Sequence, residues 1–309
     1  MLLNLIILVI SLFLLIKGAT MSTRFAVKVA ESFRLSKYIV GFIIVAIISI
    51  LPETLISINS AIQGVPSLGL ATLFGSNVAD LTLVFAVIIF VTKKNIKVES
   101  KILKNNIIYP FILIIPIILG LDGYYSRIEG VSLLIVGLIF YYFAFKNNDE
   151  PKTENVPTHD RSKYIYLLLL GMLVLLVGSH FTVTSTANLA AAVGISPIII
   201  GMFIIGLGSV IPELLFSIKS VKENDDSLAV GDLLGTVLAD ATIVVGILAL
   251  ISPFYFPIKI IYITGVFMVI ASFLLFYFMK SGKTLTKNES FILFIFWITF
   301  VLIELFLVI

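Results

Sequence analysis

Two short segments of this chain, 160 residues apart, place acidic residues inside long apolar stretches in the same order. In each segment a glutamate, Glu53 or Glu213, directly follows a proline, and an aspartate, Asp80 or Asp240, comes 27 residues later. A carboxylate at the centre of a membrane helix costs roughly 2.5–3.5 kcal/mol on insertion scales. We therefore expect the four carboxylates to bind something positively charged.

The composition places these segments in a membrane. Of all residues 60% are hydrophobic and 13% are charged, which is too apolar for a soluble domain. The absence of cysteine excludes thiolate metal sites and thiol catalysis. The two histidines, His159 and His180, lie in different segments of the chain. We predict an all-α polytopic membrane protein that carries no cofactor.

Ten stretches are long and apolar enough to span a membrane, since a hydrocarbon core of about 30 Å requires about 20 residues. The first stretch precedes the first basic residue, Lys17, and this order argues against a cleaved signal peptide. The predicted spans are roughly 2–21, 37–62, 67–92, 106–121, 130–146, 163–184, 196–219, 227–252, 257–279 and 288–308.

Basic residues set the expected orientation of the ten spans. With the N-terminus outside, nearly all lysines and arginines fall on the inner side, and only Arg127 and Lys259 fall outside. Cytoplasmic loops of membrane proteins are enriched in both residue types. We therefore predict a multi-pass protein of the cell membrane with both termini outside. Its expected partners are the lipid bilayer and inorganic cations, and not nucleic acid.

The chain divides near its middle into two halves. Residues 147–162 are strongly polar and are typical of a flexible cytoplasmic linker; they separate a five-span half, 1–146, from a second five-span half, 163–309. The halves also match at other positions, such as Gly18 with Gly178. An odd number of spans per half inverts the second copy, as in many secondary transporters whose sites form at the membrane midplane.

The repeated motif offers oxygen ligands of several kinds. A proline inside a span removes a backbone donor, which predicts a kink or break in spans 2 and 7 and frees carbonyls that need a partner. Gly75 and Gly235 permit a bend or a close helix approach. Such hard ligands suit Ca²⁺, Mg²⁺, Mn²⁺ or Na⁺. The candidate ligands are Glu53, Glu213, Asp80, Asp240, Asp232, the hydroxyls of Ser49, Ser209, Ser76 and Thr236, and the carbonyls around Ala46 and Gly206.

These motifs resemble those of the Na⁺/Ca²⁺ exchanger branch of the cation/Ca²⁺ exchanger superfamily. The family's G-T/S-S-x-P-E element corresponds to the segments that end at Glu53 and Glu213. Its G-N-x-x-G-S-N-x-x-D/N element corresponds to residues 71–80 and 231–240. The resemblance covers nearly the whole chain. It implies a Ca²⁺ antiporter with alternating access, in which the two glutamates are the central ligands and spans 1 and 6 slide across the other helices.

The chain departs from the family pattern at four positions. The serine before x-P-E, whose hydroxyl helps to bind Na⁺ in the family, is Ile50 in one half and Val210 in the other. Asp80 stands where these exchangers commonly carry asparagine, and Asp232 replaces the asparagine of G-N. Because like charges disfavour ionisation, so acidic a site can hold protons when no metal is bound. The departures favour proton coupling, or another divalent ion such as Mg²⁺ or Mn²⁺. Coupling to Na⁺ stays an alternative, because backbone carbonyls can bind Na⁺ without the missing serines.

Other classes of function compete with a divalent-cation antiporter. An intramembrane aspartyl protease also uses two buried aspartates, but it does not need a duplicated Pro–Glu pair, so we do not expect an enzyme. A non-coupled channel or uniporter seldom shows an inverted duplication. The sequence carries no nucleotide-binding motif, which argues against a primary pump. It is silent on oligomeric state, and a monomer is compatible with it.

Several polar residues have simpler interpretations. The motif hydroxyls can bond back to their own helices, Asn77 can hydrogen-bond across helices, and Asp232 can cap a helix or line a vestibule. We expect Glu304 and His180 to lie at the outer membrane interface. Five tyrosines are expected in aromatic belts, namely Tyr124, Tyr125, Tyr141, Tyr142 and Tyr255. A solvated loop is expected for Glu223, Asp225 and Asp226.

Overall fold

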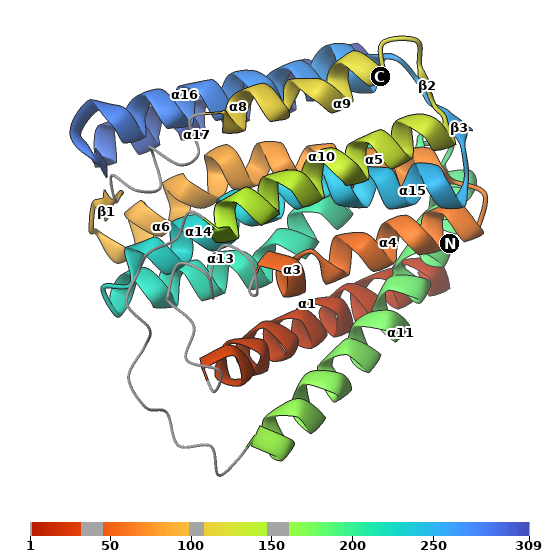
Figure 1. The fold of residues 1–309 in the computed structure, drawn as a ribbon. Coiled ribbons are helices and arrows are strands. Elements are labelled where there is room, and N and C mark those ends of the chain that lie inside the picture. The colour runs from red at the N-terminus through yellow and green to blue at the C-terminus, as the bar shows by residue number, and fades with distance from the viewer. Residues whose placement is uncertain (1, 32–45, 99–107, 147–160, 309) are drawn as a thin grey trace.

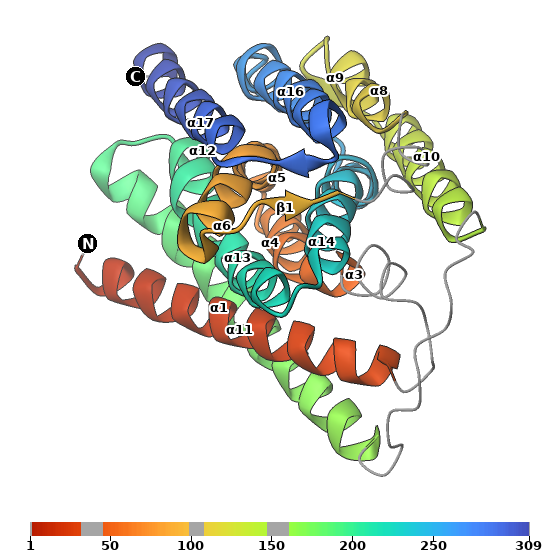
Figure 2. The same ribbon diagram turned by 90° about the vertical axis from the view of Figure 1, so that its left-hand side faces the viewer.

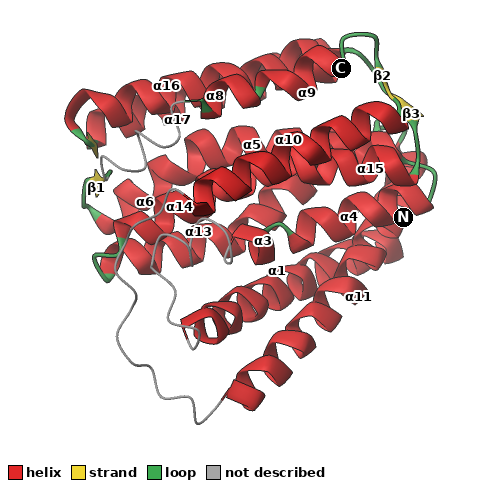
Figure 3. Ribbon diagram, in the orientation of Figure 1, coloured by secondary structure: helices red, strands yellow, loops and turns green. Residues whose placement is uncertain are grey.

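The computed structural model describes residues 2–31, 46–98, 108–146 and 161–308, and these are almost entirely helical (Figures 1 and 3). The α-helices are α1 (Leu2–Glu31), α3 (Ala46–Ser49), α4 (Leu51–Ile62), α5 (Pro66–Ala79), α6 (Phe85–Thr92), α8 (Tyr109–Ile112), α9 (Ile114–Leu119), α10 (Arg127–Lys146), α11 (Arg161–Val193), α12 (Pro197–Ile200), α13 (Gly206–Lys222), α14 (Asp226–Ala239), α15 (Val245–Ile251), α16 (Val266–Gly282) and α17 (Lys287–Val308). Four π-helical segments are η2 (Asp80–Val84), η4 (Gly201–Ile205), η5 (Asp240–Val244) and η6 (Ile260–Gly265).

Within the described residues, seven helical stretches are long and apolar enough to cross a membrane, and a shorter apolar helix covers Tyr109–Leu119. The protein is therefore an all-helical membrane protein, as predicted. Helix α1 continues ten residues beyond 21 to Glu31, and α11 runs from Arg161 to Val193 where the span 163–184 was predicted. Residues 37–45 of the second predicted span and 147–160 of the predicted linker lie outside the described residues.

Two stretches form the centre of the molecule. Pro66–Thr92 and Asp226–Ile251 are the most deeply buried of the seven, and apolar side chains along their middle, such as Phe74 and Leu238, are fully buried. Helices α1 and α11 lie together on one side of this centre, while α16, α17, α8 and α9 lie on the other (Figures 1 and 2). The segments that carry the acidic motifs are thus surrounded by the other helices.

The two central stretches change helix type at matching residues. In each, a 14-residue α-helix ends just before an aspartate and a five-residue π-helix begins at it, at Asp80 for α5 and η2 and at Asp240 for α14 and η5. The turns before them also match, because Gly64 and Asn224, 160 residues apart, both have positive φ, of 75° and 64°. At these junctions and turns the two halves therefore have the same local structure.

Short strands tie the two halves together. Strand β1 (Ile96–Lys97) pairs with β4 (Thr284–Leu285), and β2 (Tyr124–Tyr125) pairs with β3 (Phe254–Tyr255), both antiparallel. Each ribbon joins one strand from the first half to one from the second.

Helices α1 and α11 cross in close contact because glycine lies at the crossing. A Cβ atom added to Gly18 would stand 2.7 Å from the backbone nitrogen of Leu175, and one added to Gly178 would stand 2.9 Å from that of Leu15. Small residues allow membrane helices to approach this closely. The contact is reciprocal, since each glycine meets the leucine that precedes the other glycine by three residues.

Three predictions of interfacial residues were wrong. Glu304 is only 2% exposed and accepts a hydrogen bond from Thr264 of η6. Tyr125 and Tyr141 are buried, and their hydroxyls donate to the backbone oxygens of Pro116 and Gly235, at 2.6 Å in both cases. In each case a hydrogen-bond partner that is distant in sequence or on another element satisfies the polar group inside the protein, so the side chain does not need to reach water.

Candidate cation site

Glu53 lies in the first turn of α4, directly after an interruption of the helix. The chain leaves regular helix at Ile50, between α3 and α4, and Pro52 follows at the start of α4. Proline is well accommodated at the first positions of a helix because the N–H it lacks would have no partner there. The break predicted for the second span is therefore present, and it places Glu53 at a helix N-terminus.

Glu213 is placed differently from Glu53. Helix α13 continues from Gly206 to Lys222 through Pro212, so no break occurs at this proline. The irregular backbone lies instead about two turns before the proline, in the π-helix η4. Membrane helices tolerate proline when the freed carbonyl finds another partner or lines a cavity.

Asp80 and Asp240 stand at the first residues of η2 and η5. π-Helical segments inside α-helices occur frequently at functional sites. The predicted role of glycine is confirmed at Gly75, where an added Cβ would stand 2.8 Å from the backbone oxygen of Met202 in η4. Gly75 therefore allows α5 to pack closely against the segment that leads into α13 and Glu213.

Asp232 links the two halves of the chain. Ser49, at the end of α3, donates a hydrogen bond of 2.9 Å to Asp232 Oδ1 in the middle of α14. Asp232 is fully buried, so it neither caps a helix nor lies on the surface. The acid that distinguishes the second motif from the family pattern therefore contacts the first motif directly.

The five carboxylates are buried together, and most of their oxygens lack a hydrogen-bond partner. Glu213 interacts electrostatically with the other four, from both halves of the chain. Among the described residues, the buried oxygens without a hydrogen-bond partner include both of Glu53, Asp80, Glu213 and Asp240, and Oδ2 of Asp232. The exposed fractions of these five residues are 0–2%.

Unsatisfied buried polar groups are costly, about 1–3 kcal/mol each and more when charged, so each requires an explanation such as a bound ion. Within the part of the chain that the structure describes, no three acidic or histidine side chains converge in the arrangement of a formed metal centre. The carboxylates therefore share one buried region without closing around a single point.

The candidate hydroxyls fall into three groups. Ser76 and Ser209 bond back to their own helices, donating to Leu73 O and Gly206 O at 3.0 Å. Ser49 contacts Asp232, as described above. The hydroxyl of Thr236 is buried and without a partner among the described residues. Ala46 begins α3, and its side chain lies outside what the structure describes.

Two further hydroxyls near the glutamates were not proposed from the sequence. Ser57 and Ser217 are fully buried with unpartnered hydroxyls, and each lies one helical turn after Glu53 or Glu213. The i,i+4 spacing, repeated in both halves, was the available signal, since such residues share one face of a helix. Asn77 behaves as predicted and donates across helices to Met268 Sδ at 3.6 Å.

Chemically, this region offers only hard ligands. Carboxylates and hydroxyls suit alkali and alkaline-earth cations and Mn²⁺. The model for the family described as sodium/calcium exchanger protein matches the chain twice, at residues 3–146 and 163–306. The chain belongs to this family. The exchanger is therefore a transmembrane ion antiporter, and a transporter family speaks against the protease alternative.

Individual relatives are similar to the chain over most of its length. The exchanger is 29% identical to the uncharacterized membrane protein MJ0091 of Methanocaldococcus jannaschii, with 83% of each chain covered. It is 28% identical to the putative antiporter CaxA of Alkalimonas amylolytica, with 82% of each covered, and 22% identical to the sodium/calcium exchanger MaX1 of Methanosarcina acetivorans, with 97% and 98% covered. A structure of the sodium–calcium exchanger NCX_Mj soaked with Na⁺ and Sr²⁺ superposes with a TM-score of 0.73 at 24% identity, with 97% and 98% of the chains covered, which shows the same fold.

Proposed function

We propose that the exchanger moves a divalent cation, Ca²⁺ in the first place, across the cell membrane in exchange for Na⁺ or H⁺. The observation that carries this proposal is the set of five buried carboxylates from both halves, nine of whose oxygens have no hydrogen-bond partner in the described structure. A divalent cation is a partner of the right charge and chemistry for these oxygens.

In the proposed mechanism, Glu53 and Glu213 hold the divalent ion, and Asp80, Asp240 and Asp232 flank it as further ligands or as proton acceptors. Binding draws the carboxylates of the two halves together. The counter-ion competes for the same oxygens, so that only one kind of ion occupies the site at a time. The hydroxyls of Ser49, Ser209, Ser76 and Thr236 and the backbone around Ala46 and Gly206 complete the proposed ligand set.

The proposed architecture is two inverted repeats of five spans, 1–146 and 163–309, joined by the linker 147–162, with both termini outside. The matching α-to-π junctions at Asp80 and Asp240 support a duplication. So do the two paired ribbons that cross-link the halves. The distribution of lysine and arginine supports the orientation.

The two branched apolar residues of the motif bear on the driving ion. Ile50 and Val210 are buried, with exposed fractions of 6% and 3%, and neither can offer the hydroxyl that stands at this position in the family. Their burial beside the acidic residues supports H⁺ as the driving ion over Na⁺. The competing proposals are a site tuned to Mg²⁺ or Mn²⁺, and a non-coupled uniporter or channel.

The test uses the purified exchanger in proteoliposomes. Uptake of ⁴⁵Ca²⁺ is followed under an imposed Na⁺ gradient and, separately, under an imposed pH gradient, with Glu53→Gln and Glu213→Gln as matched variants. We expect a pH gradient to drive uptake and both variants to abolish it. Uptake that responds to Na⁺ alone would reverse the conclusion on the driving ion, and wild-type rates in either variant would overturn the assignment of the glutamates. Competition by Mg²⁺ or Mn²⁺ identifies the preferred divalent ion.

A further inference from the structure

On one side of the cation site, α4 is joined to α11 by side-chain hydrogen bonds. The amide of Asn59 donates to Ser179 Oγ at 3.0 Å, and the hydroxyl of Thr184 lies in hydrogen-bond contact with Gln63 Oε1 at 3.2 Å. Asn59 lies on α4 and Gln63 directly follows the helix, about two to three turns beyond Glu53. These polar contacts hold the end of α4 against α11 beyond Glu53.

The equivalent place in the second half is open. A cavity of about 670 Å³ lies between α1 and α13, lined by Arg24 and Lys28 of α1, by Pro212 and Lys219 of α13, and by Glu223 directly after it. Pro212 directly precedes Glu213, so the cavity reaches the edge of the candidate site. It lies on the lysine- and arginine-rich side, which is cytoplasmic in the proposed topology.

The 160-residue offset relates the closed contacts to the lining of this cavity. Gln63 corresponds to Glu223 and Thr184 corresponds to Arg24. The local structures agree, because the residues after both helix ends make the same turns, in which Val65 N–H donates to Ser60 O and Asp225 N–H donates to Ser220 O, at 2.9 and 2.8 Å. A neutral contact in one half thus corresponds to a pair of opposite charges in the other.

We propose that Arg24 and Glu223 form an ion pair, here called the latch, that closes the cavity when the opposite side opens, as the counterpart of the Thr184–Gln63 contact. This inference rests on the alternating access of the proposed function and extends it to the residues that seal each side. An arginine–carboxylate pair can form two parallel hydrogen bonds, which makes it suited to fixing one helix against another.

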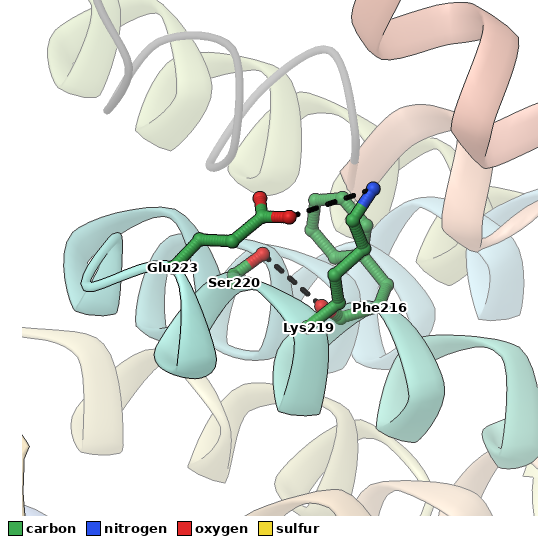
Figure 4. A network of polar contacts seen from close by, with 4 residues as sticks. All are labelled: Phe216, Lys219, Ser220 and Glu223. Atoms are coloured by element: carbon green, nitrogen blue, oxygen red, sulfur yellow. Dashed lines mark hydrogen bonds and ion pairs between the residues drawn. The ribbon is translucent and has the colours of Figure 1, made fainter.

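Glu223 is free to change partners in this way. In the present structure it pairs with Lys219, one turn before it on the same helix, at 3.8 Å (Figure 4). The two side chains are 60% and 69% exposed, and such exposed i,i+4 pairs are weak. An approach of α1 to α13 removes water from the cavity and strengthens a pair between Arg24 and Glu223.

The Asn59–Ser179 contact corresponds to no pair of opposite charges in the second half. The corresponding residues are Lys219 and Ala19, and alanine cannot accept a hydrogen bond. Closure on the cavity side is therefore assigned to Arg24 and Glu223, with Lys219 as the partner of Glu223 only while the cavity is open.

A charge-swap experiment in proteoliposomes tests the pair. We expect Arg24→Glu and Glu223→Arg each to lower ⁴⁵Ca²⁺ exchange at least fivefold, and the double swap to restore it to within twofold of the wild type. The matched control combines Glu223→Arg with Lys28→Glu, because Lys28 lines the same cavity one turn from Arg24. Rescue by this control or by a Lys219–Glu223 swap, or no rescue by the Arg24–Glu223 swap, overturns the proposal.

A second measurement reports the motion without relying on transport. The chain has no cysteine, so spin labels can be attached at introduced cysteines in two matched pairs, Lys28 with Lys222 and Ile62 with Asn188, and pulsed electron resonance gives both distances with and without Ca²⁺. We expect one distance to shorten when the other lengthens, and Glu223→Gln to reduce the population with the short Lys28–Lys222 distance. A Lys28–Lys222 distance that is fixed, or unaffected by Glu223→Gln, overturns the proposal.

The outcomes separate this proposal from the proposed function. In one outcome, the two spin-label distances change in opposite directions, but the wild type exchanges no divalent ion under any gradient. This outcome supports the latch and refutes the proposed exchange. Wild-type exchange that depends on Glu53 and Glu213, combined with failure of the Arg24–Glu223 swap, refutes the latch and leaves the exchange in place.

Discussion

Replacing Glu213 by glutamine should stabilise the empty exchanger and at the same time remove its response to Ca²⁺. Glu213 is 2% exposed, both of its oxygens lack a partner among the described residues, and it interacts with four other carboxylates. Glutamine has nearly the same volume, cannot ionise, and adds an amide that can donate to a neighbouring carboxylate. A hydrogen bond to a charged group contributes about 1.5–3 kcal/mol, so we expect a gain of about 1–3 kcal/mol.

The expected shifts in melting temperature follow from this gain. For a protein of this size 1 kcal/mol corresponds to about 2 °C, so the empty Glu213→Gln protein should melt about 2–6 °C above the wild type. Ca²⁺ at about 100 times its dissociation constant should stabilise the wild type by about 2.7 kcal/mol, or about 5 °C. It should not stabilise the variant, so the difference in stability between the two proteins should disappear or reverse when Ca²⁺ is added.

Thermal unfolding in detergent, followed by intrinsic fluorescence with and without Ca²⁺, measures both effects. Asp122→Asn is the matched control, because Asp122 is exposed in the loop before β2 and surface substitutions usually change stability by less than about 0.5 kcal/mol. A Glu213→Gln protein that melts below the wild type in the absence of Ca²⁺, or that keeps the full Ca²⁺-dependent shift, would refute the reasoning that the unpartnered carboxylate is retained for cation binding.

Three further predictions concern packing, ligation and protons. Gly75→Ala brings a Cβ to 2.8 Å from the backbone oxygen of Met202, which should cost about 1–3 kcal/mol and lower the melting temperature, whereas Gly282→Ala meets its nearest atom only at 3.5 Å and should not. Asp232→Asn can still accept the hydrogen bond from Ser49, so the fold should persist while Ca²⁺ affinity falls about tenfold, or about 1.4 kcal/mol, in an equilibrium binding assay; unchanged affinity would remove Asp232 from the site. Because protons compete for the carboxylates, calorimetry should show Ca²⁺ affinity falling with decreasing pH, by up to about tenfold per pH unit for each proton displaced, and an affinity independent of pH would contradict proton competition.

Much of the site could be predicted from the sequence because its components lie close together along the chain. The Pro–Glu pair and the aspartate that follows it recur at a fixed offset, and an acid in an apolar stretch has few explanations other than function. The interruption before Glu53 followed from Pro52 alone. These inferences needed only local spacing and the cost of placing charge in lipid.

The remaining features depend on contacts between distant segments. Glu304 is buried because Thr264, on another helix, donates to it, and Tyr141 is buried because Gly235 offers its backbone oxygen. The π-helical junctions at Asp80 and Asp240 leave no mark in residue type, since the wider turn is set by packing around the helix. At Pro212 the local signal was misleading. A proline in a span predicts a break, but Pro212 lies in a continuous helix.

The carboxylates and the proposed latch should control different quantities. The empty site is costly to move, because nine oxygens of its five buried acids have no hydrogen-bond partner in the described structure, and uncompensated charge in lipid carries a large penalty. That penalty, and not the latch, would couple the transport of one ion to the transport of the other. Variants of Arg24 and Glu223 should therefore change the rate of exchange while the ratio of counter-ions to Ca²⁺ stays constant, whereas Asp80→Asn or Asp240→Asn should change the ratio. Parallel measurement of ⁴⁵Ca²⁺ flux and of proton or Na⁺ flux in the same vesicles distinguishes the two, and a latch variant that leaks one ion without the other would show that coupling depends on the seal itself.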